Sequence, residues 1–141
     1  MSIYADTSFF TSVYLRDDHT SEALLRMSKR PRIWLTPFHK IEIAHAIAQK
    51  VFRRELSPAV ADTVHRNLSE DCDTGLWRLV DLPSAVFETG TVLARRYVPV
   101  LGTRTLDTLH VASALELKAQ HFWTFDDRQK KLAKAAGLKV T

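Results

Sequence analysis

Hydrophobic residues along the chain form two kinds of pattern. Short apolar runs that end at polar turn residues are typical of buried strands, and five of them predict strands at 3–5, 33–35, 77–82, 121–125 and 138–140. Longer segments place apolar residues every three or four positions, which predicts helices. These helices are expected at 8–15, 20–28, 37–52, 59–72, 83–97, 105–119 and 128–136.

Two helix starts carry a strong local signal. Thr36 precedes Pro37 and Ser57 precedes Pro58, which is the order of an N-cap residue followed by a proline in the first turn. Beyond these starts, Ile43, Ile47 and Val51 predict the buried stripe of one helix, and Val60, Val64 and Leu68 predict that of the next. At the other end of the chain, Gly137 is expected to terminate the last helix.

Strands that alternate with helices predict an α/β domain. Its central sheet is expected to be mostly parallel, with four to five strands flanked by helices on both faces. The chain has 141 residues and 45% hydrophobic content, which suits one core, so residues 1–141 are read as a single domain.

The composition indicates the cellular compartment and the kind of partner to expect. The single Cys72 cannot form an internal disulfide, which favours a reducing compartment such as the cytoplasm. No apolar run approaches the roughly 18 residues of a membrane span, and the N-terminus does not resemble a signal peptide. The net charge of +4 is compatible with a polyanionic partner, although the basic residues are dispersed along the chain.

The residues that suggest chemistry are acids next to predicted strands. Asp6 follows the first strand, and Asp126 with Asp127 follows the fourth, so a parallel sheet brings them to one edge. Asp107 lies in the first turn of a helix that starts at that edge, and Glu42 lies one turn into another helix. Each acid taken alone has a simpler explanation, because Asp6 can be a helix N-cap and the others can be surface acids.

Four carboxylates at one edge would repel one another unless a cation is bound. Two like charges about 4 Å apart repel by about 4 kcal/mol at an effective dielectric constant near 20. Carboxylate and water ligands suit Mg²⁺ or Mn²⁺, which activate water and bind phosphoryl oxygens. The acids therefore favour hydrolysis of phosphodiester bonds.

Other polar and aromatic residues have simpler interpretations. His110 is expected to be a partly buried helix residue, and His39 and His45 are expected at the surface or behind the acids. Trp34, Trp77 and Trp123 lie in predicted strands and are interpreted as core.

Taken together, these motifs resemble the PIN-domain ribonucleases, and most closely the VapC toxins of toxin–antitoxin pairs. The family motifs match Asp6-Thr7-Ser8 after the first strand, Glu42 on a helix, the phrase around Asp107 from Arg104 to Ala114, and Thr124-Phe125-Asp126 after a strand. The resemblance implies a PIN-like fold and metal-dependent endonuclease cleavage of RNA.

The resemblance also implies roles for single residues. Asp6 and Asp107 hold the metal, Glu42 and Asp126 complete the acidic site, and Ser8 supports them by hydrogen bonding. Thr124 and Asp127 are further supporting residues, and Asp127 leaves two choices for the fourth acid. If the family register makes Asp126 the pocket acid, Asp127 is expected to cap the last helix. The basic residues closest in sequence to the acids are candidates for RNA contact, namely Arg104, Arg128 and Lys40.

The implied partners are an RNA substrate, a second copy of the chain in a homodimer, and a small VapB-like antitoxin with a basic tail. Phe9, Phe10, Val13 and Tyr14 are either core or an anchor for that antitoxin. Two alternatives remain, a PIN-domain housekeeping nuclease and a catalytically silent PIN-like RNA-binding scaffold. A phosphatase-like α/β domain fits less well, because it expects an acid where Ser8 stands.

Overall fold

A computed structural model describes residues 1–141. Five strands alternate with seven helices along the chain. The strands are β1 (Ser2–Ala5), β2 (Arg32–Leu35), β3 (Trp77–Leu79), β4 (His121–Trp123) and β5 (Lys139–Val140). The helices are α1 (Thr7–Tyr14), α2 (Thr20–Met27), α3 (Pro37–Phe52), α4 (Pro58–Asp73), α5 (Val86–Leu101), α6 (Thr105–Glu116) and α7 (Asp127–Ala135). None of these helices is both long enough and apolar enough to cross a membrane.

The strands form one sheet in the order β3-β2-β1-β4-β5, and every neighbouring pair is parallel. This confirms the predicted α/β class, and the sheet is entirely parallel where a mostly parallel one was predicted. From β1 the chain first adds β2 and β3 on one side, and later adds β4 and β5 on the other side. The order therefore reverses between β1 and β4, which is where open α/β sheets place ligands, beyond the carboxyl ends of the strands.

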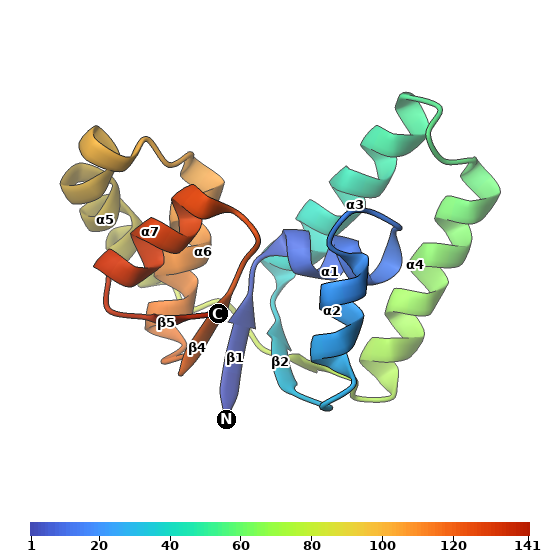
Figure 1. The fold of residues 1–141 in the computed structure, drawn as a ribbon, viewed down its shortest axis with the longest axis horizontal. Coiled ribbons are helices and arrows are strands. Elements are labelled where there is room, and N and C mark those ends of the chain that lie inside the picture. The colour runs from blue at the N-terminus through green and yellow to red at the C-terminus, as the bar shows by residue number, and fades with distance from the viewer.

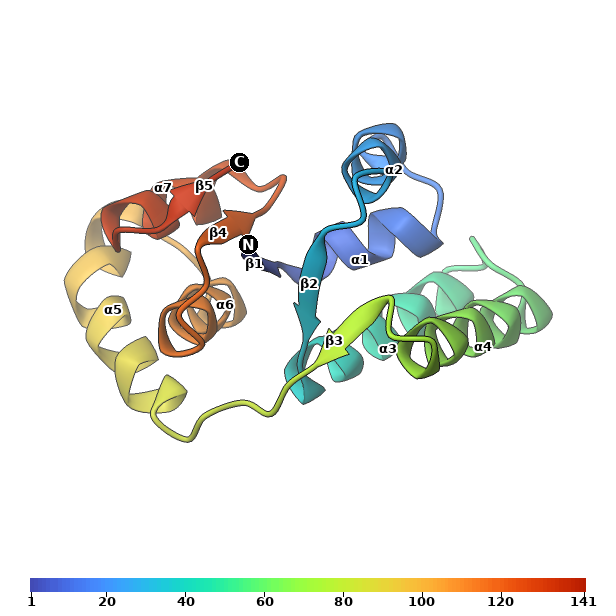
Figure 2. The same cartoon turned by 90° about the horizontal axis from the view of Figure 1, so that it is seen from below.

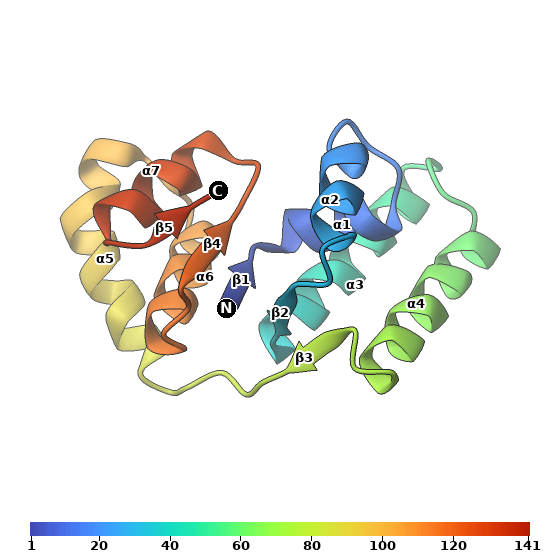
Figure 3. The same ribbon diagram turned by 60° about the horizontal axis from the view of Figure 1, so that its bottom comes forward.

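Helices cover both faces of the sheet. Helices α1 to α4 lie on one side of β1 and helices α5 to α7 lie on the other, as Figure 1 and the turned views in Figures 2 and 3 show. Alternate residues of β1 serve the two faces, because Ile3 and Ala5 belong to the cluster of α1 to α4 and Tyr4 belongs to the cluster of α5 to α7. Each face thus has its own hydrophobic core.

The two helix starts predicted from a hydroxyl residue followed by proline are confirmed. Thr36 caps α3 through a hydrogen bond from the backbone N–H of His39, and Ser57 caps α4 through one from Val60. Gly137 follows α7 with a positive φ of 91°, as expected for a residue that ends a helix.

Several predicted boundaries and buried positions were wrong. Strands β3 and β4 are shorter than predicted, and α6 ends at Glu116 rather than near residue 119. Helix α5 continues to Leu101 although Pro99 lies in its last turn, and it ends at Gly102, which has a left-handed φ of 63°. In α4 the buried stripe contains Ala61 with Val64 and Leu68, whereas Val60 is exposed.

The aromatic residues near the start of the chain are mainly core. Phe9 and Phe10 are completely buried, and Tyr14 packs partly against the same cluster. Trp77 and Trp123 are also buried, as predicted, and Trp34 is partly buried. The first helix therefore leaves Phe9 and Phe10 no surface with which to anchor a partner.

Candidate active site

Asp6 lies at the point where β1 ends and α1 begins. It is 4% exposed, and both of its carboxylate oxygens accept hydrogen bonds. Oδ1 accepts from Ser8 Oγ at 2.6 Å and from the backbone N–H of Phe9, and Oδ2 accepts from Thr124 Oγ1 at 2.7 Å. Burial raises the pKa of Asp6 above its ordinary value, and the charge of His110 and the hydroxyl donors only partly offset that shift.

Glu42 lies on α3 and is held from two other elements. Its Oε1 accepts a hydrogen bond from Thr7 Oγ1 at 2.6 Å and lies 2.5 Å from Nε2 of His110, which belongs to α6. Burial alone would raise the pKa of Glu42, but the hydrogen bond and charge of His110, with the Thr7 hydroxyl, hold it below its ordinary value. Glu42 is therefore an ionised carboxylate at neutral pH.

Asp107 lies in the first turn of α6, as predicted, and its side chain is 20% exposed. Its Oδ1 accepts a hydrogen bond from Nε2 of Gln129 at 3.1 Å, and Arg104 lies 3.3 Å from Oδ2. Gln129 itself is buried, and its Oε1 has no hydrogen-bond partner.

Asp126 and Asp127 have different surroundings. Asp126 caps α7, because its Oδ1 accepts a 2.7 Å hydrogen bond from the backbone N–H of Gln129, and its own N–H donates to Thr124 Oγ1. The side chain of Asp127 is 90% exposed and has only a 4.0 Å contact with Lys130. The expectation that Asp127 caps the last helix was wrong, since Asp126 does so.

Three of the four acids are linked through shared hydrogen-bond partners, whereas Glu42 is held separately by Thr7 and His110. Thr124 bonds both Asp6 and the backbone of Asp126, and Gln129 bonds both Asp126 and Asp107. No three histidine, cysteine, aspartate or glutamate side chains lie close enough together to hold a metal ion by themselves. The expected meeting of all four carboxylates in one pocket is therefore a looser arrangement along the sheet edge.

This donor set fits a hydrated Mg²⁺ or Mn²⁺. Mg²⁺ keeps several water ligands and takes one or two carboxylates, so it needs no cluster of three side chains. Asp6 also has a raised pKa because its charge is buried, and a cation beside it would remove that electrostatic cost. The residues that could hold the ion are the predicted acids Asp6 and Asp107, with Glu42 and Asp126 beside them.

The predicted basic residues are not equally close to the acids. Arg104 contacts Asp107 directly, and its side chain is 80% exposed. Arg128 is exposed in the first turn of α7, next to the acids at 126 and 127. Lys40 instead lines a separate cavity beside β2 and β3, together with Asp81.

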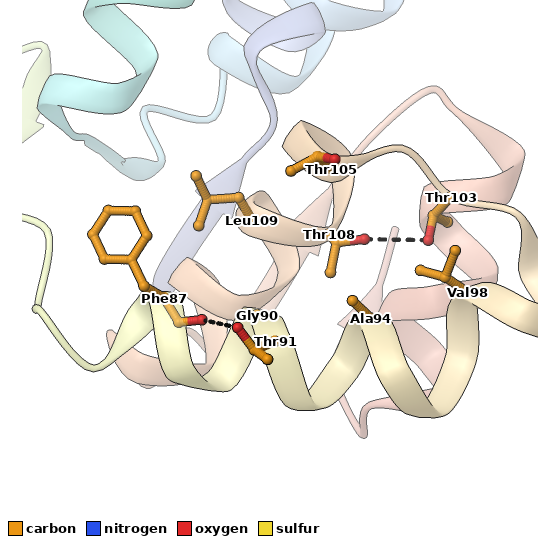
Figure 4. Close-up of a pocket in the computed structure, with 9 residues that line it drawn as sticks. All are labelled: Phe87, Gly90, Thr91, Ala94, Val98, Thr103, Thr105, Thr108 and Leu109. Carbon is orange, nitrogen blue, oxygen red and sulfur yellow. Dashed lines mark hydrogen bonds between the residues drawn. The ribbon is translucent and has the colours of Figure 1, made fainter.

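Two larger cavities differ in their chemistry. A groove of about 540 Å³ lies between α1 and α3. Glu42 is the only one of the four acids in its lining, which also includes Ser8 and the exposed apolar side chains of Ile41 and Leu106. A second cavity of about 400 Å³ lies between α5 and α6 and is lined by apolar and threonine side chains without an ionisable group, as Figure 4 shows. Only the first cavity adjoins groups that can move a proton or bind a cation.

Three polar residues at this site were not identified from the sequence. His110 and Thr7 hold Glu42, and Gln129 holds Asp107. A weak signal existed for His110, because three positions on a helix place it on the same side as Asp107. The partners of Thr7 and Gln129 are distant in sequence and left no local pattern.

The family model described as PIN domain matches residues 3–135 of the chain. A search of curated protein sequences found no match.

Solved structures with the same fold include three from bacteria. FitAcB from Neisseria gonorrhoeae is 16% identical, with 98% of this chain and 95% of that chain covered and a TM-score of 0.72. VapBC2 from Rickettsia felis, bound to a DNA fragment from its promoter, is 14% identical, with 100% and 98% covered and a TM-score of 0.69. VapC20 from Mycobacterium tuberculosis, a toxin that cleaves the sarcin-ricin loop, is 16% identical, with 96% and 95% covered and a TM-score of 0.69. At these identities the likeness establishes the shared fold.

Proposed function

The chain belongs to the PIN domain family, and from that premise we propose that it is a metal-dependent endoribonuclease and the toxin of a toxin–antitoxin pair. The observation that carries the proposal is the buried Asp6, which lies at the reversal of strand order and is linked by hydrogen bonds to the neighbourhood of Asp126. The fold of VapC20, an RNA-cleaving toxin, supports the substrate class. Cleavage of RNA by such a toxin would take place in the cytoplasm.

In this proposal Asp6 and Asp107 hold Mg²⁺ or Mn²⁺, and Glu42 and Asp126 complete the site. The ion supplies a positive charge that activates water and stabilises the negative charge on the phosphoryl oxygens. Ser8 and Thr124 fix the two oxygens of Asp6, so that the carboxylate keeps one orientation. Glu42, ionised and open to the groove, would orient the attacking water by accepting a hydrogen bond from it.

Basic residues around the acids support an RNA substrate. Arg104 and Arg128 are exposed beside Asp107 and Asp126, where each can contact a phosphate next to the one that is cleaved. Lys40 contributes less in this proposal, because it lines the cavity beside β2 and β3.

The groove beside Glu42 supports an antitoxin partner. Ile41 is 68% exposed and Leu106 is 49% exposed there, which offers an apolar surface next to carboxylates. A VapB-like tail with an apolar side chain followed by Arg or Lys would bury that surface and form charge-assisted hydrogen bonds with the acids. This groove replaces the segment around Phe9 and Phe10 as the proposed anchor.

A homodimer is part of the same proposal. The cavity between α5 and α6 has an uncharged lining, and Phe87 at its edge is 63% exposed (Figure 4). A second copy that covers this face would leave the acids on α3, α6 and the sheet edge open to RNA.

The test compares the wild type with Asp6→Asn, each expressed without a partner, and then each purified protein on generic RNA with EDTA, Mg²⁺ or Mn²⁺. We expect the wild type alone to stop growth and to cleave RNA only with metal, and sequencing of the new 5′ ends would give the cleavage sites. Metal-dependent cleavage without toxicity would favour a housekeeping nuclease. RNA binding without cleavage would favour a silent scaffold and would overturn the proposed function.

A further inference from the structure

A hydrogen-bonded chain of side chains runs from the core to the candidate site. Nδ1 of His110 lies 2.9 Å from the hydroxyl of Tyr4, and Nε2 lies 2.5 Å from Oε1 of Glu42. Tyr4 is completely buried on β1, and the side chain of His110 is 3% exposed. Glu42 is at the open end of this chain, where it lines the groove.

The direction of these hydrogen bonds follows from what each group can donate. Oε1 of Glu42 is an acceptor, because the Thr7 hydroxyl donates its hydrogen to it. Nε2 of His110 must therefore carry a hydrogen. When the imidazole is neutral, Nδ1 is then an acceptor and the buried Tyr4 hydroxyl supplies the hydrogen, and when the imidazole is protonated, Nδ1 donates to the Tyr4 oxygen instead.

Glu42 is held asymmetrically as a result. Both donors, Thr7 and His110, bind the same oxygen, Oε1. Oε2 accepts no hydrogen bond from the protein, so one oxygen is fixed and the other is available in the groove.

We propose that His110 is a positioning residue that fixes the Glu42 carboxylate toward the bound cation and the attacking water, and that Tyr4 fixes the imidazole of His110. The proposal rests on the proposed function for its chemistry, and on the contacts above for its geometry. His110 does not line the groove, so it would act through Glu42.

A second buried histidine shows what a purely structural role looks like. His39 is completely buried, its Nε2 lies 2.8 Å from the backbone carbonyl of Ala5, and its Nδ1 bonds Thr36 at the start of α3. The rings of His39 and His110 are 5.2 Å apart. His39 contacts none of the four acids, which makes it a matched control for His110.

The experiment compares His110→Phe, which keeps the ring volume without a donor, with His110→Gln, which keeps an N–H donor near the place of Nε2. Tyr4→Phe removes only the hydroxyl, and His39→Phe is the control. Mn²⁺ affinity is measured by calorimetry without RNA, kcat and KM are measured on RNA, and thermal unfolding reports stability.

We expect His110→Phe to weaken Mn²⁺ binding and lower kcat by about 10–100-fold, the usual effect of losing a residue that orients a metal ligand, with a smaller change in KM. His110→Gln should recover most of that loss, and Tyr4→Phe should cause a smaller one. His39→Phe should lower the melting temperature and leave Mn²⁺ affinity in the wild-type range. A folded His110→Phe protein that binds Mn²⁺ and cleaves RNA as the wild type does would overturn the proposal.

A separate measurement distinguishes this proposal from the proposed function. Long-range ¹H–¹⁵N correlation spectra of the metal-free wild type should show a hydrogen on Nε2 of His110, and Glu42→Leu should change that signal. If the wild type neither binds Mn²⁺ nor cleaves RNA, the proposed function fails. The position of the hydrogen on the His110 ring would still show whether His110 holds Glu42 as proposed. A neutral His110 with its hydrogen on Nδ1 would refute the positioning role.

Discussion

Replacing Asp6 with asparagine should abolish cleavage and leave the metal-free protein at least as stable as the wild type at neutral pH. Asparagine keeps the shape of the side chain and an acceptor for Ser8 and the N–H of Phe9. It loses the charged hydrogen bond from Thr124, which is worth about 1.5–3 kcal/mol, but it also removes a buried charge.

The sign of the pH dependence follows from the raised pKa of Asp6. The folded protein holds the Asp6 proton more tightly than the unfolded chain, so this group lowers stability as pH rises from its ordinary value of 3.8 to its folded pKa. Asp6→Asn removes that loss. The stability of the variant relative to the wild type should therefore be greater at about pH 7 than at about pH 4.

Metal binding predicts a second measurable effect, an increase in the melting temperature Tm. A ligand at 100 times its Kd stabilises the folded state by about 2.7 kcal/mol, which corresponds to an increase in Tm of roughly 5–10 °C for a chain of this size. The wild type should show this increase with Mn²⁺, and Asp6→Asn should not. Its activity should fall by more than about a hundredfold, because loss of an outer-sphere partner alone typically costs 10–100-fold.

The assay combines urea unfolding at the two pH values, thermal melts with EDTA or Mn²⁺, and RNA cleavage. Ser8→Ala is a useful control, since it removes one donor to Asp6 and keeps the charge. The assignment of Asp6 would be refuted by full activity in a folded Asp6→Asn protein, or by an equal Mn²⁺-dependent increase in Tm in both proteins.

Three further predictions concern the other acids. Asp107→Asn should abolish metal-dependent cleavage with an unchanged circular dichroism spectrum, and activity at the wild-type level would contradict its role. Asp126→Asn should reduce activity much more than Asp127→Asn, while Asp126→Ala should also lose the α7 cap and about 1 kcal/mol of unfolding free energy; the reverse ranking would make Asp127 the fourth acid. Glu42 has a lowered pKa, so its contribution to stability is present above its ordinary value of 4.5 and is lost as pH falls through its folded pKa. Glu42→Gln should remove that loss, and unfolding curves in acid that are parallel for both proteins would count against it.

The sequence predicted the parts of the fold that depend on local chemistry. The caps at Thr36 and Ser57 were correct because a hydroxyl followed by proline determines where a helix begins. The predicted end of β4 was wrong because the length of β4 depends on the neighbouring strand with which it pairs. The last hydrogen bond between the β1 segment and β4 runs from the N–H of Asp6 to the carbonyl oxygen of Trp123. The chain then turns into α1, so β1 offers β4 no partner beyond this point.

The buried face of α4 shows a similar limit. Val60 and Ala61 both combine with Val64 and Leu68 into a helical stripe, and hydrophobicity favours Val60. Packing against α3 buries Ala61 instead. The choice depends on how closely the two helices approach, which the sequence of one helix does not contain.

In the candidate site, too, some residues could be predicted from local sequence and others could not. Asp6, Asp107 and Asp126 could be found because each follows a strand or lies in the first turn of a helix, and Glu42 could be found only from the family motif. The residues that hold them could not, because His110 is 68 positions from Glu42 and Gln129 is 22 positions from Asp107. A histidine in a helix has no local feature that separates a structural position such as His39 from a position beside an acid.

Capping a helix and forming the acidic site are not alternatives for Asp6. It caps α1 and Asp126 caps α7, and these two helices follow the neighbouring strands β1 and β4. A helix N-terminus carries partial positive charge, which favours a carboxylate beside it. The two caps therefore stabilise negative charge at the sheet edge before any cation binds, and they fix one oxygen of each acid through a backbone N–H. The same local chemistry that begins the helices thus provides ordered carboxylates for the proposed metal.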